Sequence, residues 1–265
     1  MSYKFLSPEV VEQARRLGEF DLVIATPAKD TFPTVAHVLA VASVARVYYF
    51  SGRRVLLFLS DSGSTDGTVE AARELELPKD TPLLINILSE PPGKGKAVKA
   101  ELELAHAVKA KALVTVDSDL LSVCPMWIKN LADPLFAGYD FIAPYYVRHK
   151  YDGTITNTIA YPLTRALYGR RVRQPIGGDF GLSGRLVERL LELDWPEDAL
   201  FFGVDIFMTT TALAEGFRVG QAALGAKIHE AKDPASSLGP MLSLIHISEP
   251  TRPRLISYAV FCLKK

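Results

Sequence analysis

The chain has 265 residues, 48% hydrophobic and 23% charged, with a formal net charge of zero. This size and composition suit one globular domain with a full core, and the absence of a basic excess argues against nucleic acid as the main partner. No apolar run approaches the roughly 20 residues of a membrane span, the N-terminus lacks the apolar core of a signal peptide, and two cysteines offer no disulfide framework. We therefore expect a soluble cytoplasmic protein.

Short apolar runs alternate with helical patterns through the first half of the chain. In chain order, we predict strands at residues 20–25, 55–59, 83–88 and 112–116, and helices at residues 34–50, 68–75 and 94–109. Beyond residue 119 the pattern is mixed, and we predict strands at 141–147 and 218–224 and helices near 159–167 and 203–215. Continuously apolar strands that alternate with helices predict an α/β fold, with a mainly parallel sheet covered by helices on both faces.

Polar clusters follow three of these strands, at residues 27–31, 61–66 and 117–119. Ligands of parallel sheets bind beyond the carboxyl ends of the strands. The coincidence of these clusters with strand ends therefore predicts one ligand site at that edge.

Asp117 and Asp119 follow the fourth predicted strand, one residue apart. Two such carboxylates can face one divalent cation, which completes its shell with phosphate oxygens. The alternative is a solvated turn or a helix N-cap. His229 follows a largely apolar stretch, and it is either structural or a further ligand of the same metal.

Two other segments combine capping with possible ligand contacts. In the segment 61–68, Thr65 and Asp66 suit a helix N-cap, while Asp61 and Ser62 could hydrogen-bond a base or ribose. Lys94 lies in a Gly-Lys-Gly-Lys turn at a predicted helix N-terminus, which suits an anion but lacks the P-loop spacing.

Taken in order, these motifs resemble those of GT-A glycosyltransferases, and most of all the retaining branch that contains glucosyl-3-phosphoglycerate and mannosylglycerate synthases. The resemblance covers roughly residues 20–241. The motifs are Pro-Ala at 27–28, Asp-Ser-Gly-Ser-Thr-Asp at 61–66, Gly-Lys-Gly-Lys-Ala at 93–97, Asp-Ser-Asp at 117–119, Gln-Pro-Ile-Gly-Gly-Asp at 174–179, Gly-Val-Asp at 203–205 and His229.

The resemblance implies a GT-A fold and a nucleotide-sugar site. Asp119 and His229 would bind Mg²⁺ or Mn²⁺, with Asp117 near the metal or the ribose. Lys227 would contact the donor diphosphate. The residues implied to hold the base and ribose are Pro27, Ala28, Asp61, Ser62 and Lys94.

The resemblance also implies residues around the transferred sugar. The catalytic candidates are Asp179, which would line the donor sugar with Gly178, and Asp205, which would lie near the sugar or acceptor. Arg148 and Thr156 match positions that bind an acceptor carboxylate. A guanidinium can grip a carboxylate through two hydrogen bonds, but Arg148 could equally be a solvated loop residue.

The chain departs from the family pattern at two places. Thr31 occupies the end of the first motif, where the family usually has a glutamate, which bears on ribose recognition. Thr154 stands where the phosphoglycerate branch has an arginine, which weakens the case for a phosphorylated acceptor.

The last residues change in character. Residues 242–265 resemble a translated sequencing-library adapter, with a transposon-end segment at 242–252, an index at 253–255 and a primer site running into poly-A at 256–265. The alternative is an ordinary strand-rich tail. We expect a glycosyltransferase domain at residues 1–241, C-terminally truncated, followed by a non-native tail; family members continue with helices involved in dimers or the acceptor site, so the full-length protein is a candidate homodimer.

The hypothesis from the sequence is a metal-dependent retaining hexosyltransferase that uses a UDP- or GDP-sugar and a small hydroxylated acceptor, such as glycerate. One alternative is a sugar-nucleotide pyrophosphorylase, although residues 26–34 lack the glycine-rich loop of that class. The other is a non-catalytic sugar-nucleotide binding protein.

Overall fold

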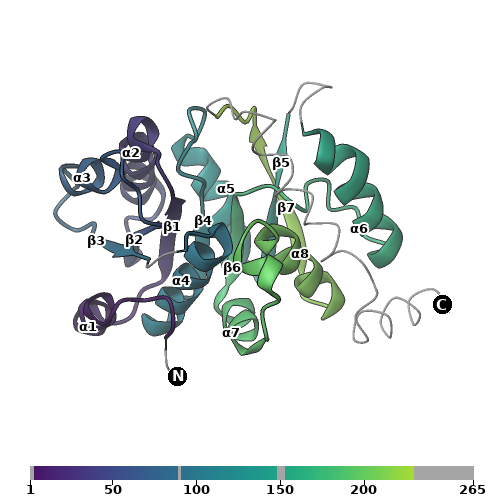
Figure 1. The fold of residues 1–265 in the computed structure, drawn as a ribbon, viewed down its shortest axis with the longest axis horizontal. Coiled ribbons are helices and arrows are strands. Elements are labelled where there is room, and N and C mark those ends of the chain that lie inside the picture. The colour runs from purple at the N-terminus through teal and green to yellow at the C-terminus, as the bar shows by residue number, and fades with distance from the viewer. Residues whose placement is uncertain (1–2, 89–90, 148–152, 230–265) are drawn as a thin grey trace.

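The computed structural model describes residues 3–88, 91–147 and 153–229 (Figure 1). The predicted tail at 242–265 and its boundary at residue 241 lie outside the described residues, as does Arg148.

A seven-stranded sheet forms the centre of the molecule, with the strand order β3-β2-β1-β4-β6-β5-β7. Strand β6 runs antiparallel to β4 and β5, and the other neighbouring strands are parallel. The strands are β1 (Leu22–Ala28), β2 (Val55–Asp61), β3 (Leu83–Ile87), β4 (Ala112–Thr115), β5 (Phe141–Tyr146), β6 (Phe180–Ser183) and β7 (Val219–Gly225).

Helices cover both faces of this sheet (Figure 1). One face packs against α1 (Pro8–Leu17), α4 (Lys94–Ala107), α7 (Gly184–Glu192) and α8 (Val204–Ala214). The other packs against α2 (Phe32–Tyr49) and α5 (Pro125–Phe136), with α3 (Thr68–Arg73) beside α2. The remaining elements are a π-helical turn η1 (Thr156–Ala160), α6 (Tyr161–Tyr168) and a 3-10 turn η2 (Glu197–Leu200).

The apolar character of β1 follows from its place in the middle of the sheet. Leu22 and Ile24 pack toward α2 and α5, whereas Val23 and Ala25 pack toward α4. Every residue of β1 is buried, so the strand has no polar face. The predicted α/β class, with a mainly parallel sheet and helices on both faces, is confirmed.

Several predicted boundaries need correction. Strand β1 continues past Thr26 to Ala28 because it pairs with β2 as far as Asp61. The helix predicted near 159–167 is two elements, η1 and α6. The elements α1, α5, β6, α7 and η2 were not predicted, and β6 gives the sheet its one reversed strand.

Candidate active site

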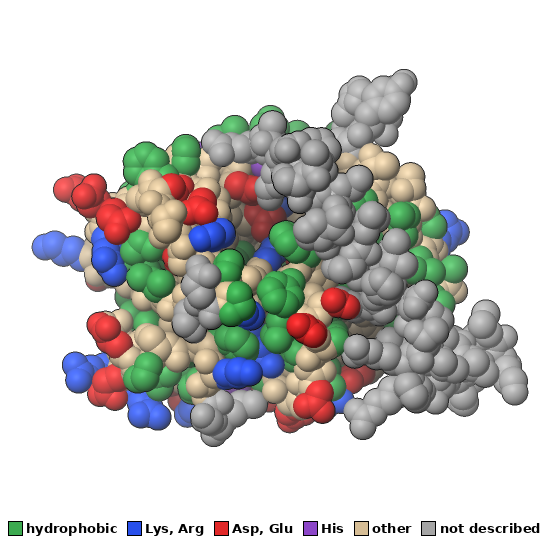
Figure 2. Space-filling model, viewed as in Figure 1, with side chains coloured by type: hydrophobic (Ala, Val, Ile, Leu, Met, Phe, Trp, Pro, Cys, Tyr) green, Lys and Arg blue, Asp and Glu red, His purple; other side chains and the backbone are tan. Residues whose placement is uncertain are grey.

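A cavity of about 490 Å³ lies where β1, β2 and β4 end. Its walls come from five segments: residues 27–31 at the end of β1, Ser62 after β2, residues 92–94 and Ala97 at the start of α4, residues 117–119 after β4, and residues 201–202 after η2. Acidic and basic side chains lie together in the hollow of the face seen in Figure 2. Residues from all three polar clusters therefore line one cavity, although the cluster at 61–66 contributes only Ser62.

Asp61 supports this cavity without lining it. Its buried carboxylate accepts hydrogen bonds from the backbone N–H groups of Gly63 and Ser64, at 2.9 and 2.8 Å, and from the Ser64 hydroxyl. The cavity wall is formed instead by Ser62, the next residue. Asp61 thus shapes the turn that presents Ser62 to the cavity.

The Gly-Lys-Gly turn at the start of α4 is locked against η2. The N–H of Gly95 donates to the carbonyl of Phe201 at 2.8 Å. A Cβ on Gly95 would lie 1.8 Å from the carbonyl oxygen of Ala199, so only glycine permits this approach. The turn points Lys94 into the cavity.

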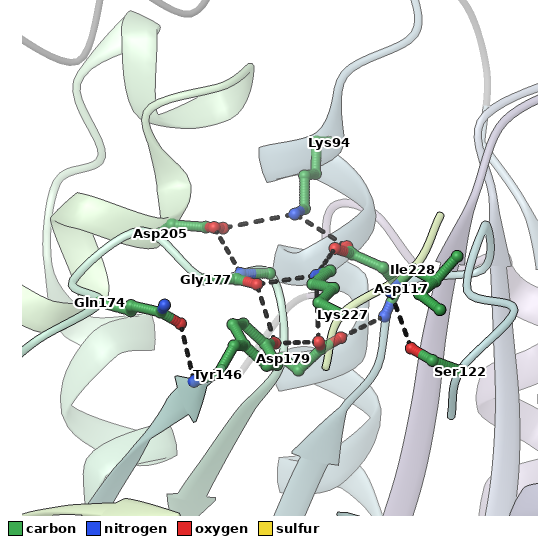
Figure 3. Close-up of polar contacts among 11 residues, drawn as sticks. Lys94, Asp117, Ser122, Tyr146, Gln174, Gly177, Asp179, Asp205, Lys227 and Ile228 are labelled. Carbon is green, nitrogen blue, oxygen red and sulfur yellow. Dashed lines mark hydrogen bonds and ion pairs between the residues drawn. The ribbon is translucent and has the colours of Figure 1, made fainter. Parts of the chain in front are cut away.

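Asp117 lies between Lys94 and Lys227, two lysines that are far apart in the sequence (Figure 3). The ammonium of Lys94 lies 2.9 Å from Asp117 Oδ1 and 3.5 Å from Asp205 Oδ1. The ammonium of Lys227 lies 2.9 Å from Asp117 Oδ2 and 3.0 Å from Asp179 Oδ2. Burial by itself lowers the pKa of both lysines, but the carboxylates around them raise it above its ordinary value, so both stay charged.

Asp179 is fully buried and does not line the cavity. Its Oδ1 accepts the backbone N–H of Asp117 at 2.8 Å, and its Oδ2 contacts Lys227 and the hydroxyl of Tyr146. Burial raises the pKa of Asp179, and Lys227 opposes that rise. Through these contacts, Asp179 holds Asp117, Tyr146 and Lys227 together.

Gly178 occupies a position that only glycine tolerates. Its φ is +83°, and a Cβ there would lie 2.0 Å from Asp117 Oδ2. Its N–H donates to Asp205 Oδ2 at 2.8 Å. The backbone around Gly178 therefore packs directly on the two carboxylates of Asp117 and Asp205.

Asp119 and His229 are brought near one another by backbone pairing. An isolated antiparallel bridge joins Leu120 to His229, and the N–H of Leu121 donates to the carbonyl of Ile228 at 2.9 Å. Within the described ranges, no group of three or more His, Cys, Asp or Glu side chains is arranged to hold a metal. A cation bound beside Asp119 and His229 would need further ligands, such as phosphate oxygens.

The structure describes only one of the two acceptor candidates, Thr156. Thr156 is buried in η1 and does not line the cavity, and Arg148 lies outside the described residues.

A protein-family model matches residues 33–189, and it describes glycosyl transferase family 2. That match covers more than half of the chain. The chain belongs to glycosyl transferase family 2.

A curated relative is similar in sequence over most of the chain. A glucosyl-3-phosphoglycerate synthase from Mycolicibacterium paratuberculosis (strain ATCC BAA-968 / K-10) is 29% identical over 212 residues, which are 70% of this chain and 59% of the relative. The chain thus spans less than two thirds of that relative's length.

Two solved structures are similar over nearly the whole chain. Glucosyl-3-phosphoglycerate synthase from Mycobacterium tuberculosis, in complex with Mn²⁺, UDP and phosphoglyceric acid, has a TM-score of 0.69 and 23% identity, covering 97% of this chain and 84% of that one. The same enzyme with Mn²⁺, UDP-glucose and glycerol 3-phosphate gives 0.67 and 22%, covering 98% and 86%. These likenesses show that the chain has the GT-A fold of that enzyme.

Two residues of the site were not predicted from the sequence. Tyr146 ends β5 with its hydroxyl on Asp179, and nothing in its local sequence indicates that partner. Glu101 is fully buried on α4, and burial raises its pKa from 4.5 to about 8. Its spacing of seven residues from Lys94, two helical turns, was the available signal.

Among the described helices, none is long and apolar enough to cross a membrane.

Proposed function

We propose that this chain is a divalent-metal-dependent retaining glycosyltransferase. It moves a hexose from a UDP- or GDP-sugar to a small hydroxylated acceptor that carries a carboxylate, such as glycerate. The observation that carries the proposal is the cavity beyond β1, β2 and β4, with Lys94 and Asp117 in its wall beside Asp119. Membership of glycosyl transferase family 2 supports the reaction class.

The donor nucleotide fits the outer part of the cavity. Pro27, Ala28 and Ser62 offer an apolar wall and one hydroxyl to the base and ribose. Lys94 and Lys227 supply two charged ammonium groups beside Asp117 for the diphosphate. Hydrogen bonds from two buried ammonium groups to a diphosphate would be short and strong, because both partners are charged.

The residues near the bridge at Leu120 and His229 fit a divalent cation. Asp119 and His229 offer a carboxylate oxygen and an imidazole nitrogen, which suit Mg²⁺ or Mn²⁺ when donor phosphate oxygens and water complete the shell. When bound, such a cation neutralises the charge that develops on the departing diphosphate. The Mn²⁺ present with UDP in the similar mycobacterial structure supports this assignment.

The transfer itself needs positioning more than a protein nucleophile. The bond between the anomeric carbon and the diphosphate oxygen breaks, a bond to the acceptor hydroxyl oxygen forms on the same face, and the hydroxyl proton passes to a diphosphate oxygen. We assign Asp205, whose carboxylate is held by the Gly178 N–H and by Lys94, to contact the sugar or acceptor. Lys94 and Lys227 stabilise the leaving diphosphate.

Calorimetry and a turnover assay test the proposal. UDP and GDP are titrated into the protein with Mn²⁺ and with EDTA. UDP- and GDP-hexoses are then supplied with glycerate, phosphoglycerate or buffer alone, and the anomeric configuration of the product is read by NMR. We expect Mn²⁺-dependent binding of one nucleotide and an acceptor-dependent product with the donor's configuration.

The outcomes also separate the alternatives. Release of pyrophosphate from a nucleoside triphosphate and a sugar phosphate would indicate a pyrophosphorylase. Tight nucleotide binding without transfer or hydrolysis would indicate a binding protein. A product of inverted anomeric configuration would contradict the retaining mechanism but leave the rest of the proposal standing.

A further inference from the structure

Tyr146 is buried at the end of β5 and packs under the candidate active site. Its ring lies tilted against the ring of Trp127, with the centroids 5.6 Å apart. The preceding residue, Tyr145, points away and is 47% exposed. The two neighbouring tyrosines therefore offer a buried residue and a matched exposed control.

Tyr146 forms hydrogen bonds on both sides of Gly178 in the loop at residues 174–179. Its backbone N–H donates to the side-chain oxygen of Gln174 at 3.3 Å. Its hydroxyl lies 3.1 Å from the carbonyl oxygen of Gly177 and also contacts Asp179 Oδ2. The Tyr146 hydroxyl has one proton to donate. Of its two possible acceptors, the charged Asp179 carboxylate forms the stronger hydrogen bond, and the Gly177 carbonyl the weaker.

The Tyr146 side chain also lies beside Lys227 and shares hydrogen-bond acceptors with it (Figure 3). The Lys227 ammonium lies 5.2 Å from the centre of the Tyr146 ring. It donates to Gly177 O at 2.8 Å and pairs with Asp179 Oδ2, the two acceptors that Tyr146 also contacts. Cation–π attraction and a shared pair of acceptors thus tie the place of Lys227 to Tyr146.

We propose that Tyr146 is a positioning residue whose hydroxyl makes Lys227 available to the donor diphosphate. The inference rests on the proposed function. The hydroxyl satisfies part of the Asp179 charge, and without it Asp179 would hold Lys227 more tightly. A diphosphate that approaches Lys227 would then compete with a stronger internal partner. A nucleoside monophosphate, which lacks the second phosphate, would be affected less.

The test uses Tyr146→Phe, which removes only the hydroxyl, and Tyr145→Phe as the control. UDP and UMP are titrated in Mn²⁺ by calorimetry, or GDP and GMP if the wild type prefers guanine. We expect Tyr146→Phe to weaken diphosphate binding about tenfold, the order expected for one hydrogen bond to a charged group, with monophosphate binding unchanged. Tyr145→Phe should match the wild type in both titrations.

A double-mutant cycle with Asp179→Asn tests the route. If Tyr146 acts through the Asp179 charge, Tyr146→Phe has no further effect in the Asp179→Asn background. Additive effects, unchanged diphosphate binding, or an equal loss of both nucleotides with a lower Tm would overturn the inference. Failure of the wild type to bind any nucleotide would instead reject the proposed function, and this inference with it.

Discussion

Glu101→Gln is expected to stabilise the protein near neutral pH, because the Glu101 carboxyl group is fully buried in the folded protein. Among the described residues, neither carboxylate oxygen has a hydrogen bond of good geometry. The nearby Thr115 hydroxyl is close enough to lower the pKa of Glu101 somewhat, but not enough to offset burial. Burial raises the pKa of Glu101 from 4.5 to about 8, with Lys94 opposing that rise. The group therefore stays protonated in the folded protein at pH 7, whereas it ionises in the unfolded chain.

The sign and size follow from proton linkage. Between pH 4.5 and about 8 the folded state binds one proton more than the unfolded state, so the wild type loses stability as pH rises through this window. Each pKa unit corresponds to about 1.4 kcal/mol, so the cost at pH 7 is about 3 kcal/mol. Glutamine has the same shape and no such proton. The variant should therefore gain about 3 kcal/mol over the wild type at pH 7 and almost nothing at pH 4.5.

Urea unfolding at pH 5, 6, 7 and 8 measures this difference directly. Glu188→Gln, which changes an exposed acid on α7, is the matched control and should show no comparable trend. A Glu101→Gln difference that stays constant with pH would refute the reasoning. A wild type more stable than the variant at pH 7 would show that Glu101 is ionised and well paired.

Three further outcomes test the site. Asp119→Ala should abolish the Mn²⁺ dependence of nucleotide binding in calorimetry, and equal wild-type affinity in Mn²⁺ and EDTA would contradict the metal assignment. Gly178→Ala should cost more stability in urea unfolding than Gly169→Ala. Both glycines have positive φ, but only at position 178 would the added Cβ clash, at 2.0 Å from Asp117 Oδ2; the control should lose about 1–2 kcal/mol. Arg148→Lys should raise the KM of a carboxylate acceptor about tenfold or more with donor Kd unchanged, because lysine lacks the two-pronged guanidinium; an unchanged KM would reject that contact.

Much of the fold could be predicted because its signals are local. Strands buried on both faces, such as residues 22–28 and 55–61, are apolar nearly throughout, and helical patterns separate them. The elements that were missed have weaker local signals. Strand β6 has only four residues, and α5 contains Pro134 within its helical run. The direction of β6 depends on pairing with β4 and β5, which no local pattern encodes.

For the candidate site, too, one part could be predicted from the sequence and another only from the tertiary structure. Its location was determined by sequence, because parallel strands place their carboxyl ends on one edge and the polar clusters follow those ends. The division of roles among the acids was decided by tertiary structure. Asp61 turns into its own loop, and Asp179 is buried under Lys227 and Tyr146. Residue type alone cannot distinguish these carboxylates, since a carboxylate's role depends on which charged and hydrogen-bonding groups the fold packs against it.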